Sequence, residues 1–347
     1  MSTYGDISPR VGIYAVENML AHAEPISILT KMGQVKPVPK NRGQVVKFRR
    51  PVPWSDPIVG GAGNSSTGSI TNWTAPALTE GVTPSATSFS YVDVQVTLGQ
   101  YGNYVEITDK IQDLHEDPVL NDQTQLAGEN AAETMELITY NVLRAGTTVK
   151  YLGGAARANV NSAVTLDSLR AAVRNLQAQR AKKITSILGP STNISTRPVE
   201  AAYVAFCHTD CQADIRALTG FTPTAEYGSR QTLCPEEFGT VEDIRFVTSP
   251  LFAPMINLGA AIGGTGLKST AGSNIDVYPI MIVGKEAYGT TPLKGMQSAE
   301  IKVLNPGTPR GGDPLGQRGT VGWKAWFAAV RLNESWMYRL EVGVKAL

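Results

Sequence analysis

One stretch of the chain, from Pro118 to about Ala145, restricts the possible folds more than any other feature. Its apolar side chains recur at intervals of three, four and seven residues, as on one face of an α-helix: Leu120, Ala127, Ala131, Met135, Ile138 and Val142. Asp117 and Pro118 form a helix start signal, and Gly146 follows as a stop. The pattern predicts an amphipathic helix of roughly 28 residues, hence roughly 42 Å long. A helix of that length is a rigid rod to which the rest of the chain must attach.

Two predicted strands precede this helix and are separated by a long segment rich in glycine and serine. The first covers residues 44–50 and is halted by Pro51 and Pro53; the second covers residues 92–98 and alternates apolar and polar side chains. A structureless loop of about 40 residues is uncommon inside a compact domain. The sequence therefore predicts a long two-stranded flap, a ribbon that is barely stable unless it packs against something else.

The first 40 residues predict one short helix, Tyr14 to Ala23, followed by a stretch interrupted by Pro25, Pro37 and Pro39. A segment of this kind does not form a compact core alone, so we interpret it as an arm lying on something else. We expect the arm and the flap to find packing partners only on neighbouring copies of the chain.

The segment after the long helix predicts smaller elements. A second helix is expected from Leu166 to about Lys183, with basic residues at its C-terminal end. A buried strand at residues 202–206 and a short helix capped by Asp210 follow it.

The last part of the chain is expected to be rich in turns and strands. Residues 219–316 are mostly turns around short apolar runs, and two strands, residues 324–332 and 335–345, are expected to be joined at Asn333 and Glu334. The 34 glycines and 21 prolines are spread along the chain, which is typical of many turns. Helices and strands together predict an α+β protein of two or three domains.

Charge and cysteine content exclude several classes of protein. With 31 basic and 30 acidic residues the chain has no net field to hold nucleic acid or a membrane surface, which argues against a DNA-binding accessory protein.

The chain begins without a secretory signal and contains no apolar stretch of about 18 residues, so we expect no membrane contact and a cytoplasmic site of synthesis. Three cysteines argue against a disulfide framework.

One cluster has metal-ligand character: Cys207, His208 and Cys211, with Cys234 downstream. The first two leave a strand on opposite faces, and no second paired motif completes a tetrahedral set. We expect buried thiols, no cofactor and no enzyme activity; the competing interpretation is a metal-dependent hydrolase that uses Cys207, His208 and Cys211. Stoichiometric zinc in the purified protein would support that interpretation.

The glycine-rich segment 259–269 superficially resembles a phosphate-binding loop. Leu267 separates Gly266 from Lys268, whereas the Walker pattern needs glycine and lysine side by side. We expect a surface loop here.

Charges are segregated along the chain. Between Glu24 and Asp56 no acid occurs, while the segment holds seven cations: Lys31, Lys36, Lys40, Arg42, Lys47, Arg49 and Arg50. From Glu106 to Glu136 nine acids occur against Lys110 alone. Either these are two solvated faces, or they are complementary surfaces by which the arm and flap of one copy rest on the acidic helix of the next. The second interpretation gives these candidate inter-subunit contacts: Lys40, Arg42, Lys47, Arg49, Arg50, Glu129, Glu133 and Glu136.

Several short strings carry a resemblance to a known family. They lie at residues 78–84, 99–109, 203–210, 237–239, 283–289 and 322–325. In this order they resemble the tailed-phage major capsid proteins named after the coat protein of coliphage N-four, whose shell fold is of the Hong Kong 97 type. The resemblance covers roughly residues 75–347.

The resemblance implies a division of the chain and a function. It implies an N-terminal arm (1–40), an extended hairpin loop (41–98), a peripheral domain with a spine helix (99–160), an axial domain (161–315) and a C-terminal return to the peripheral domain (316–347). It further implies hexamers and pentamers of an icosahedral head that is assembled in the bacterial cytoplasm and encloses double-stranded DNA. The implied partners are the chain itself, a portal, scaffold or decoration proteins, and the packaged DNA by non-specific contact.

Overall fold

The computed structural model describes most of the chain and leaves several segments out. The described residues are 27–39, 43–51, 80–83, 91–110, 119–188, 196–228, 230–293, 299–307, 309 and 311–347. The helix predicted at Tyr14 to Ala23, and the contact candidates Lys40 and Arg42, lie outside them.

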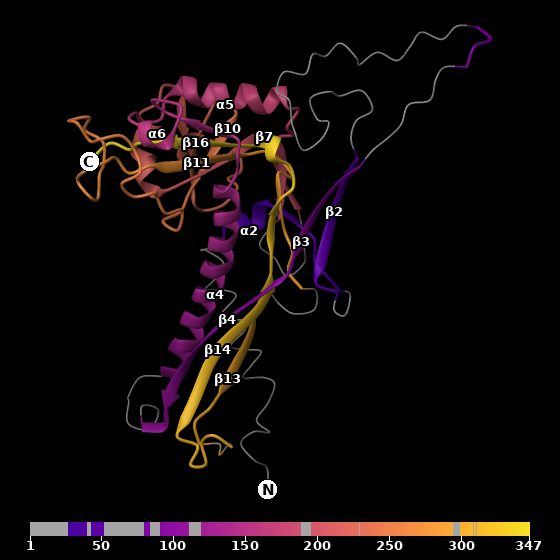
Figure 1. Ribbon diagram of the computed structural model, residues 1–347, viewed down its shortest axis with the longest axis vertical. Helices are drawn as coiled ribbons and strands as arrows, with labels where there is room; N and C mark the ends of the chain where they lie inside the picture. The colour runs from indigo at the N-terminus through magenta and orange to yellow at the C-terminus, as the bar shows by residue number, and fades with distance from the viewer. Residues whose placement is uncertain are drawn as a thin grey trace.

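The long helix α4 (Val119–Arg144) confirms the prediction to within about a residue at each end. Its 26 residues span about 39 Å and run along the whole lower part of the molecule in Figure 1. The predicted stripe is partly right, since Ala131 and Met135 are buried. The buried face also includes Glu136, Thr139 and Tyr140, which the apolar pattern did not indicate.

A three-stranded antiparallel sheet lies along α4, in the order β13 (Glu300–Leu304), β14 (Arg318–Phe327) and β4 (Gly99–Thr108). Strands β14 and β4 stay in register over ten residue pairs. The side chains of β14 that face α4 form a core with the middle of the helix: Trp323, Ala325 and Phe327 pack with Ala131 and Met135. Helix and sheet thereby brace each other along their length.

A larger mixed sheet forms the upper body of Figure 1. Its strands, in spatial order, are β5 (Val149–Tyr151), β16 (Met337–Val342), β11 (Tyr278–Val283), β7 (Thr196–Cys207), β10 (Ile244–Thr248), β9 (Glu237–Val241) and β8 (Phe221–Pro223), with β6 (Ile184–Leu188) beside β7. Strand β7 contains the predicted strand 202–206, and β11 is buried along its whole length, as expected for a sheet covered on both faces.

The two faces of this sheet are covered by different helices. Helix α5 (Leu166–Ala178) packs on one face through Leu169 and Leu176, against Tyr203 and Ile280. The end of α4 packs on the other face: Tyr140 and Leu143 lie in a core with Val204, Phe206 and Met281. The rod is therefore anchored beneath the larger sheet.

Two predictions about helix ends are corrected. Helix α5 ends at Ala178, not near Lys183, because Arg180 adopts a left-handed conformation (φ 55°) and the N–H of Ala181 bonds back to Leu176 O. Asp210 does not cap the short helix α6 (Gln212–Arg216).

A 3₁₀ turn, Thr209–Cys211, precedes α6, and the ring of His208 caps this turn by accepting the N–H of Asp210 at 3.1 Å. Further 3₁₀ turns lie at Arg157–Asn159, Thr224–Glu226 and Glu334–Trp336.

The described part of the arm lies on its own chain. Helix α2 (Leu29–Met32) packs against α4, and β1 (Gln34–Val35) pairs in parallel with β12 (Tyr288–Thr290), whose other neighbour is β15 (Ala329–Arg331). Leu29 is fully buried, and Tyr288 Oη donates to its carbonyl at 2.7 Å. The expectation that arm and flap pack only on other copies is therefore wrong for residues 27–39.

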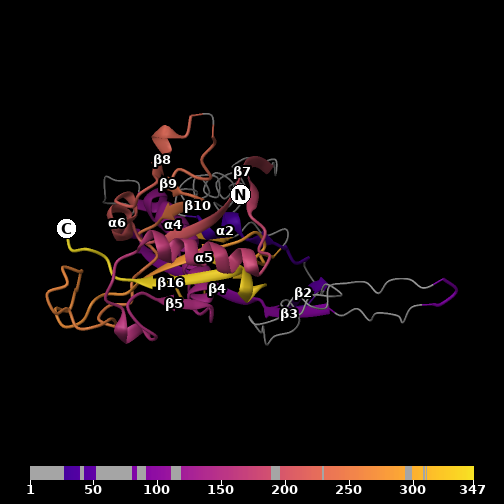
Figure 2. The same ribbon diagram turned by 90° about the horizontal axis from the view of Figure 1, so that it is seen from above.

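The predicted flap is confirmed at its base. Strands β2 (Val45–Pro51) and β3 (Tyr91–Thr97) pair antiparallel from Val45 with Thr97 to Pro51 with Tyr91. Figure 2 shows the pair lying out to one side of the body, away from the C-terminus. The foot of the flap packs on its own chain, because Val46 and Phe48 are buried with Val38, Leu98 and Ala328.

The two C-terminal strands that the sequence predicts on either side of Asn333 and Glu334 lie in different sheets. Strand β14 joins the small sheet beside β4, β15 pairs with β12, and β16 crosses into the larger sheet between β5 and β11. The turn around Asn333 and Glu334 therefore connects two sheets instead of closing a hairpin. Among the described helices, none has the length and apolar content that crossing a bilayer requires.

Candidate assembly surfaces

The flap base carries three of the predicted cations, but an acid on the flap pairs with two of them. Arg49 binds Asp93 with both Nε (2.8 Å) and Nη2 (3.0 Å), and Lys47 Nζ lies 3.4 Å from the same carboxylate. These hydrogen bonds lower the pKa of Asp93 to about 2, so it is ionised at neutral pH. The flap is therefore less basic than its first strand suggests.

Arg50 differs from the other two cations. It is half-buried, and burial lowers the pKa of its guanidinium. Within the described residues its Nε and Nη1 have no hydrogen-bond partner. Arg50 thus has two buried donors without a partner among the described residues.

The three acidic candidates on α4 lie in two different environments. Glu129 and Glu133 are half-buried on the side of the helix. Glu136 is fully buried, and its Oε1 accepts the backbone N–H groups of Leu29 (2.7 Å) and Ile28 (3.2 Å). Glu136 consequently cannot meet a neighbouring copy, and its place among the surface contacts is wrong.

An open groove of about 260 Å³ lies between the first half of α4 and the edge strand β4. Its apolar walls are exposed: Tyr104 is 65%, Leu126 53% and Val105 48% accessible. On its floor Trp323 Nε1 donates to Asn130 Oδ1 at 3.0 Å. The sequence pattern missed this groove, because Leu126 lies off the apolar stripe and alternation along β4 is weak.

The small sheet is also hollowed, by about 420 Å³, where Lys302 and Lys324 flank the exposed Tyr104. Gly322 makes this close packing possible: a Cβ there would lie 2.7 Å from Tyr104 Cβ and 2.9 Å from the carbonyl oxygen of Asn103.

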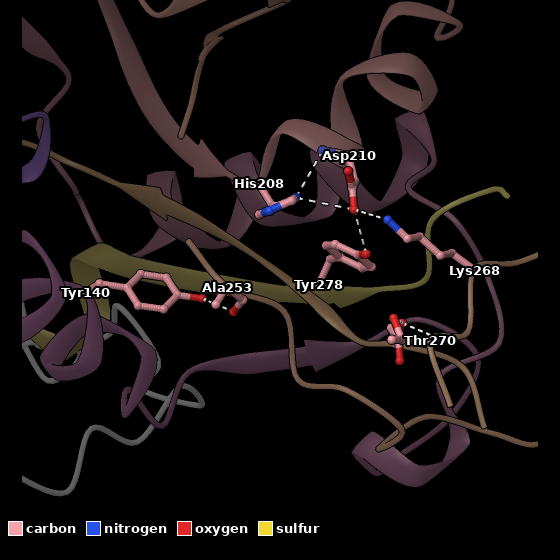
Figure 3. A network of polar contacts seen from close by, with 8 residues as sticks. Tyr140, His208, Asp210, Ala253, Lys268, Thr270 and Tyr278 are labelled. Atoms are coloured by element: carbon pink, nitrogen blue, oxygen red, sulfur yellow. Dashed lines mark hydrogen bonds and ion pairs between the residues drawn. The ribbon is translucent and has the colours of Figure 1, made fainter. Parts of the chain in front are cut away.

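The end of the larger sheet carries a polar network that fixes the glycine-rich segment (Figure 3). Asp210 Oδ2 accepts from Lys268 Nζ at 2.6 Å and from Tyr278 Oη at 2.8 Å. Asp276, fully buried, accepts from Thr270 N and Oγ1 and from Asn257 N. The segment is thus a surface loop held at defined points, with exposed Ile256 and Leu258 at its start.

The cysteine and histidine cluster does not have the geometry of a metal or catalytic site. Cys207 and Cys211 are buried in the core beneath α5, and burial raises the pKa of both thiols, so they stay protonated at neutral pH. Burial lowers the pKa of His208, whose Nδ1 is already engaged. In the part of the chain that the structure describes, no three His, Cys, Asp or Glu side chains are grouped to hold a metal. The hydrolase interpretation gains no support.

Two comparisons of sequence relate this chain to known proteins. A family model described as phage capsid protein matches residues 91–340. The major capsid protein of Pseudomonas phage KPP21 is 22% identical to this chain over 282 residues, which is 76% of this chain and 70% of that protein.

Solved capsid structures share the fold. The capsid of Ralstonia phage GP4 matches with a TM-score of 0.64 at 12% identity, over 91% of this chain and 88% of that one. The cyanophage Pam1 capsid matches with a TM-score of 0.55 at 14% identity, over 94% and 93%. These likenesses confirm an α+β phage capsid fold. Because the family model also covers well over half of the sequence, the chain belongs to the phage capsid protein family.

Proposed function

We propose that this chain is the major capsid protein of a tailed phage and that it assembles into the hexamers and pentamers of an icosahedral head around double-stranded DNA. The observation that carries the proposal is that one subunit has both a flap that projects from its body (Figure 2) and an exposed apolar groove beside α4. Among the described residues, Val46 and Phe48 hold the foot of the flap on its own subunit, and we infer that another part of the flap contacts a neighbouring copy.

The groove beside α4 is the surface on which we place a neighbour's flap. Tyr104, Val105 and Leu126 offer apolar area, and Glu129 and Glu133 follow along the same helix. Burial of the apolar area supplies affinity, while charge sets register and choice of partner. Of the predicted basic contacts, Lys47 and Arg49 are exposed but already bind Asp93, whereas two donors of Arg50 are buried without a described partner.

The domain division and the remaining partners belong to the same proposal. Residues 1–40 act as the arm, 41–98 as the extended loop, 99–160 as the peripheral domain, 161–315 as the axial domain around each capsomer centre, and 316–347 as the return. The sheets support a role for residues 316–347 in both domains, because β14 lies beside β4 of the peripheral domain and β16 lies beside β11 of the axial domain. A portal, a scaffold or decoration protein, non-specific DNA contact, assembly in the host cytoplasm and kinship with the coliphage N-four group complete the proposal.

Expression of the full chain and negative-stain electron microscopy test the proposal. Closed shells or ring-shaped capsomers are expected. A subunit that stays monomeric at high concentration, with or without the phage's other head proteins, contradicts it.

A charge-reversal series then tests the contact itself. Replacing Lys47, Arg49 and Arg50 by glutamate should reduce particle yield while circular dichroism shows a folded subunit. The matched control reverses three exposed cations outside the flap: Lys150, Arg174 and Lys182. Normal yield from the flap variant means that the flap does not rest on an acidic surface. A restored yield when Glu129 and Glu133 are changed to lysine in the same chain would support the assigned partner.

A further inference from the structure

Glu136 combines a deep position with incomplete pairing. Its side chain is fully buried in the middle of α4, and its Oε1 accepts the backbone N–H groups of Leu29 and Ile28. Its Oε2 has no hydrogen-bond partner among the described residues. An ionised carboxylate in such a place costs free energy that either a proton or access to water relieves.

The groups around Glu136 determine the pKa of its carboxyl group. Burial raises the pKa of Glu136 to about 7, although the backbone N–H groups of Leu29, Ile28 and Thr30 and the charge of Lys31 on α2 oppose this. The titratable neighbour from β12 is Tyr288, whose pKa is raised well above its usual value by burial and by Glu136 itself. The charge of Glu136 is therefore not fully compensated inside the subunit.

The arm is the part of the chain that closes over this carboxyl group. Ile28 and Leu29 are buried where they contact it, and they share a core with Tyr140, one turn further along α4. If the arm lifts, Glu136 meets water and its pKa returns toward the ordinary value near 4.5. By linkage, the closed arm must then bind the proton more tightly than the open arm.

We propose that residues 27–39 and Glu136 form a proton-dependent latch, in which the arm lies closed on α4 while the carboxyl group is neutral and opens as it ionises. The geometry that carries the proposal is a buried, half-paired carboxylate covered by a short segment, which packs on α4 through Ile28 and Leu29 and pairs with β12.

The latch reaches the base of the flap. Lys36 Nζ donates to Lys47 O at 3.0 Å, and Val38 packs with Val46 and Phe48. Opening of the arm removes these supports and lets the flap change its angle to α4. This consequence for assembly rests on the proposed function, whereas the latch itself does not.

Hydrogen exchange on the isolated full-length subunit tests the latch. The amides to follow are those of Ile28 and Leu29, and those of Lys36 and Val38, which bond to Thr290 O and Pro292 O. After correction for intrinsic exchange, their protection should fall about tenfold between about pH 6 and about pH 8.5. Amides of β11 serve as the internal control for global unfolding.

Three variants separate the latch from a merely structural contact. Glu136→Gln imitates the neutral form, so protection of the arm should stay high and become independent of pH. Glu133→Gln, one turn away and half-buried, should keep the fall seen in the parent protein. Leu29→Ala removes the buried anchor and should expose the arm at both pH values.

The proposal is overturned if the parent arm shows no change with pH, or if Glu136→Gln retains the same change. It is also overturned if β11 loses protection in parallel with the arm, because the event is then global unfolding. All readouts use single subunits, so their outcome does not depend on whether shells form.

Discussion

The carboxylate of Glu136 accepts the backbone N–H of Leu29 at 2.7 Å, a contact that joins the middle of the long helix to a segment 107 residues earlier in the chain. The same pair of residues explains why the arm lies against α4. The backbone of α2 meets an acceptor that no water reaches, and the side chains of Ile28 and Leu29 fill the space beside Tyr140 and Leu143.

The first prediction concerns stability against pH. Glu136 loses its proton near pH 4.5 in the unfolded chain but only near pH 7 in the folded one. Between these values the folded state holds one proton more, so the free energy of unfolding falls as the pH rises through this window. The fall attributable to this group is about 3 kcal/mol.

Urea unfolding of the parent protein and of Glu136→Gln at several pH values measures this effect. Between about pH 4.5 and about pH 8, the free energy of unfolding of the variant should rise by that amount relative to the parent. Taking the difference removes the contributions of other titrating groups, such as His208. A constant difference across the range would mean that Glu136 does not keep its proton in the folded protein.

The second prediction concerns the loop that follows Met255. Asp276 satisfies three donors at once, Thr270 N, Thr270 Oγ1 and Asn257 N, at 2.6–2.9 Å. Asp276→Ala removes the buried acceptor that all three donors share, which should cost about 3 kcal/mol of unfolding free energy. Proteolysis within residues 259–272 should also become faster.

Asp167→Ala is the control for Asp276. That residue is exposed in the first turn of α5, so only a small loss is expected. Equal losses in the two variants would show that Asp276 does not hold the loop.

Local patterns predicted local elements well in this chain. The long helix, the flap base and the strand at 202–206 each follow from side-chain periodicity and stop signals, which act within a few residues. Contacts between distant segments were not predictable in this way. Nothing in the sequence around Glu136 distinguishes a carboxylate that caps an arm from Glu129 or Glu133 on the same helix.

The C-terminal strands show the same limit. Strong alternation predicted that residues 324–345 form strands, but the partner of a strand depends on which edges are free. Strand β14 pairs with β4 and β16 pairs with β11, and nothing within residues 324–345 identifies those partners. The groove at Tyr104 arises only once β4 and α4 are side by side, so it has no signature in either segment alone.

The third prediction concerns the thiols. Burial raises the pKa of Cys207 and Cys211, and raises that of the half-buried Cys234 to about 12. In native protein near pH 8 a thiol-reactive dye should label all three slowly, with Cys234 first, and all three rapidly in urea. Fast labelling of Cys207 or Cys211, or stoichiometric zinc in the purified protein, would instead revive the metal-site interpretation.

The fourth prediction compares two arginine–carboxylate pairs with nearly equal distances. Arg157 donates to both oxygens of Glu341, from Nε (2.6 Å) and Nη2 (2.8 Å), whereas Arg170 donates twice to Oε1 of Glu242, from Nε (2.8 Å) and Nη2 (2.6 Å). The pairs differ in burial: Glu341 is fully buried, whereas both members of the second pair are exposed.

Removing one partner of a buried ion pair leaves the other charge uncompensated, which costs roughly 3 to 5 kcal/mol in proteins. Arg157 is itself about one-third exposed and Arg339 Nε lies 3.0 Å from Glu341, so the loss in Arg157→Met should be about 2 kcal/mol. Arg170→Met should leave the free energy of unfolding nearly unchanged, because water and salt screen the exposed pair. Urea unfolding of both variants at low and high salt measures these losses. Only the Arg157 variant should lose stability at both salt concentrations. Equal losses in the two variants would show that burial of Glu341 does not control the strength of its pair.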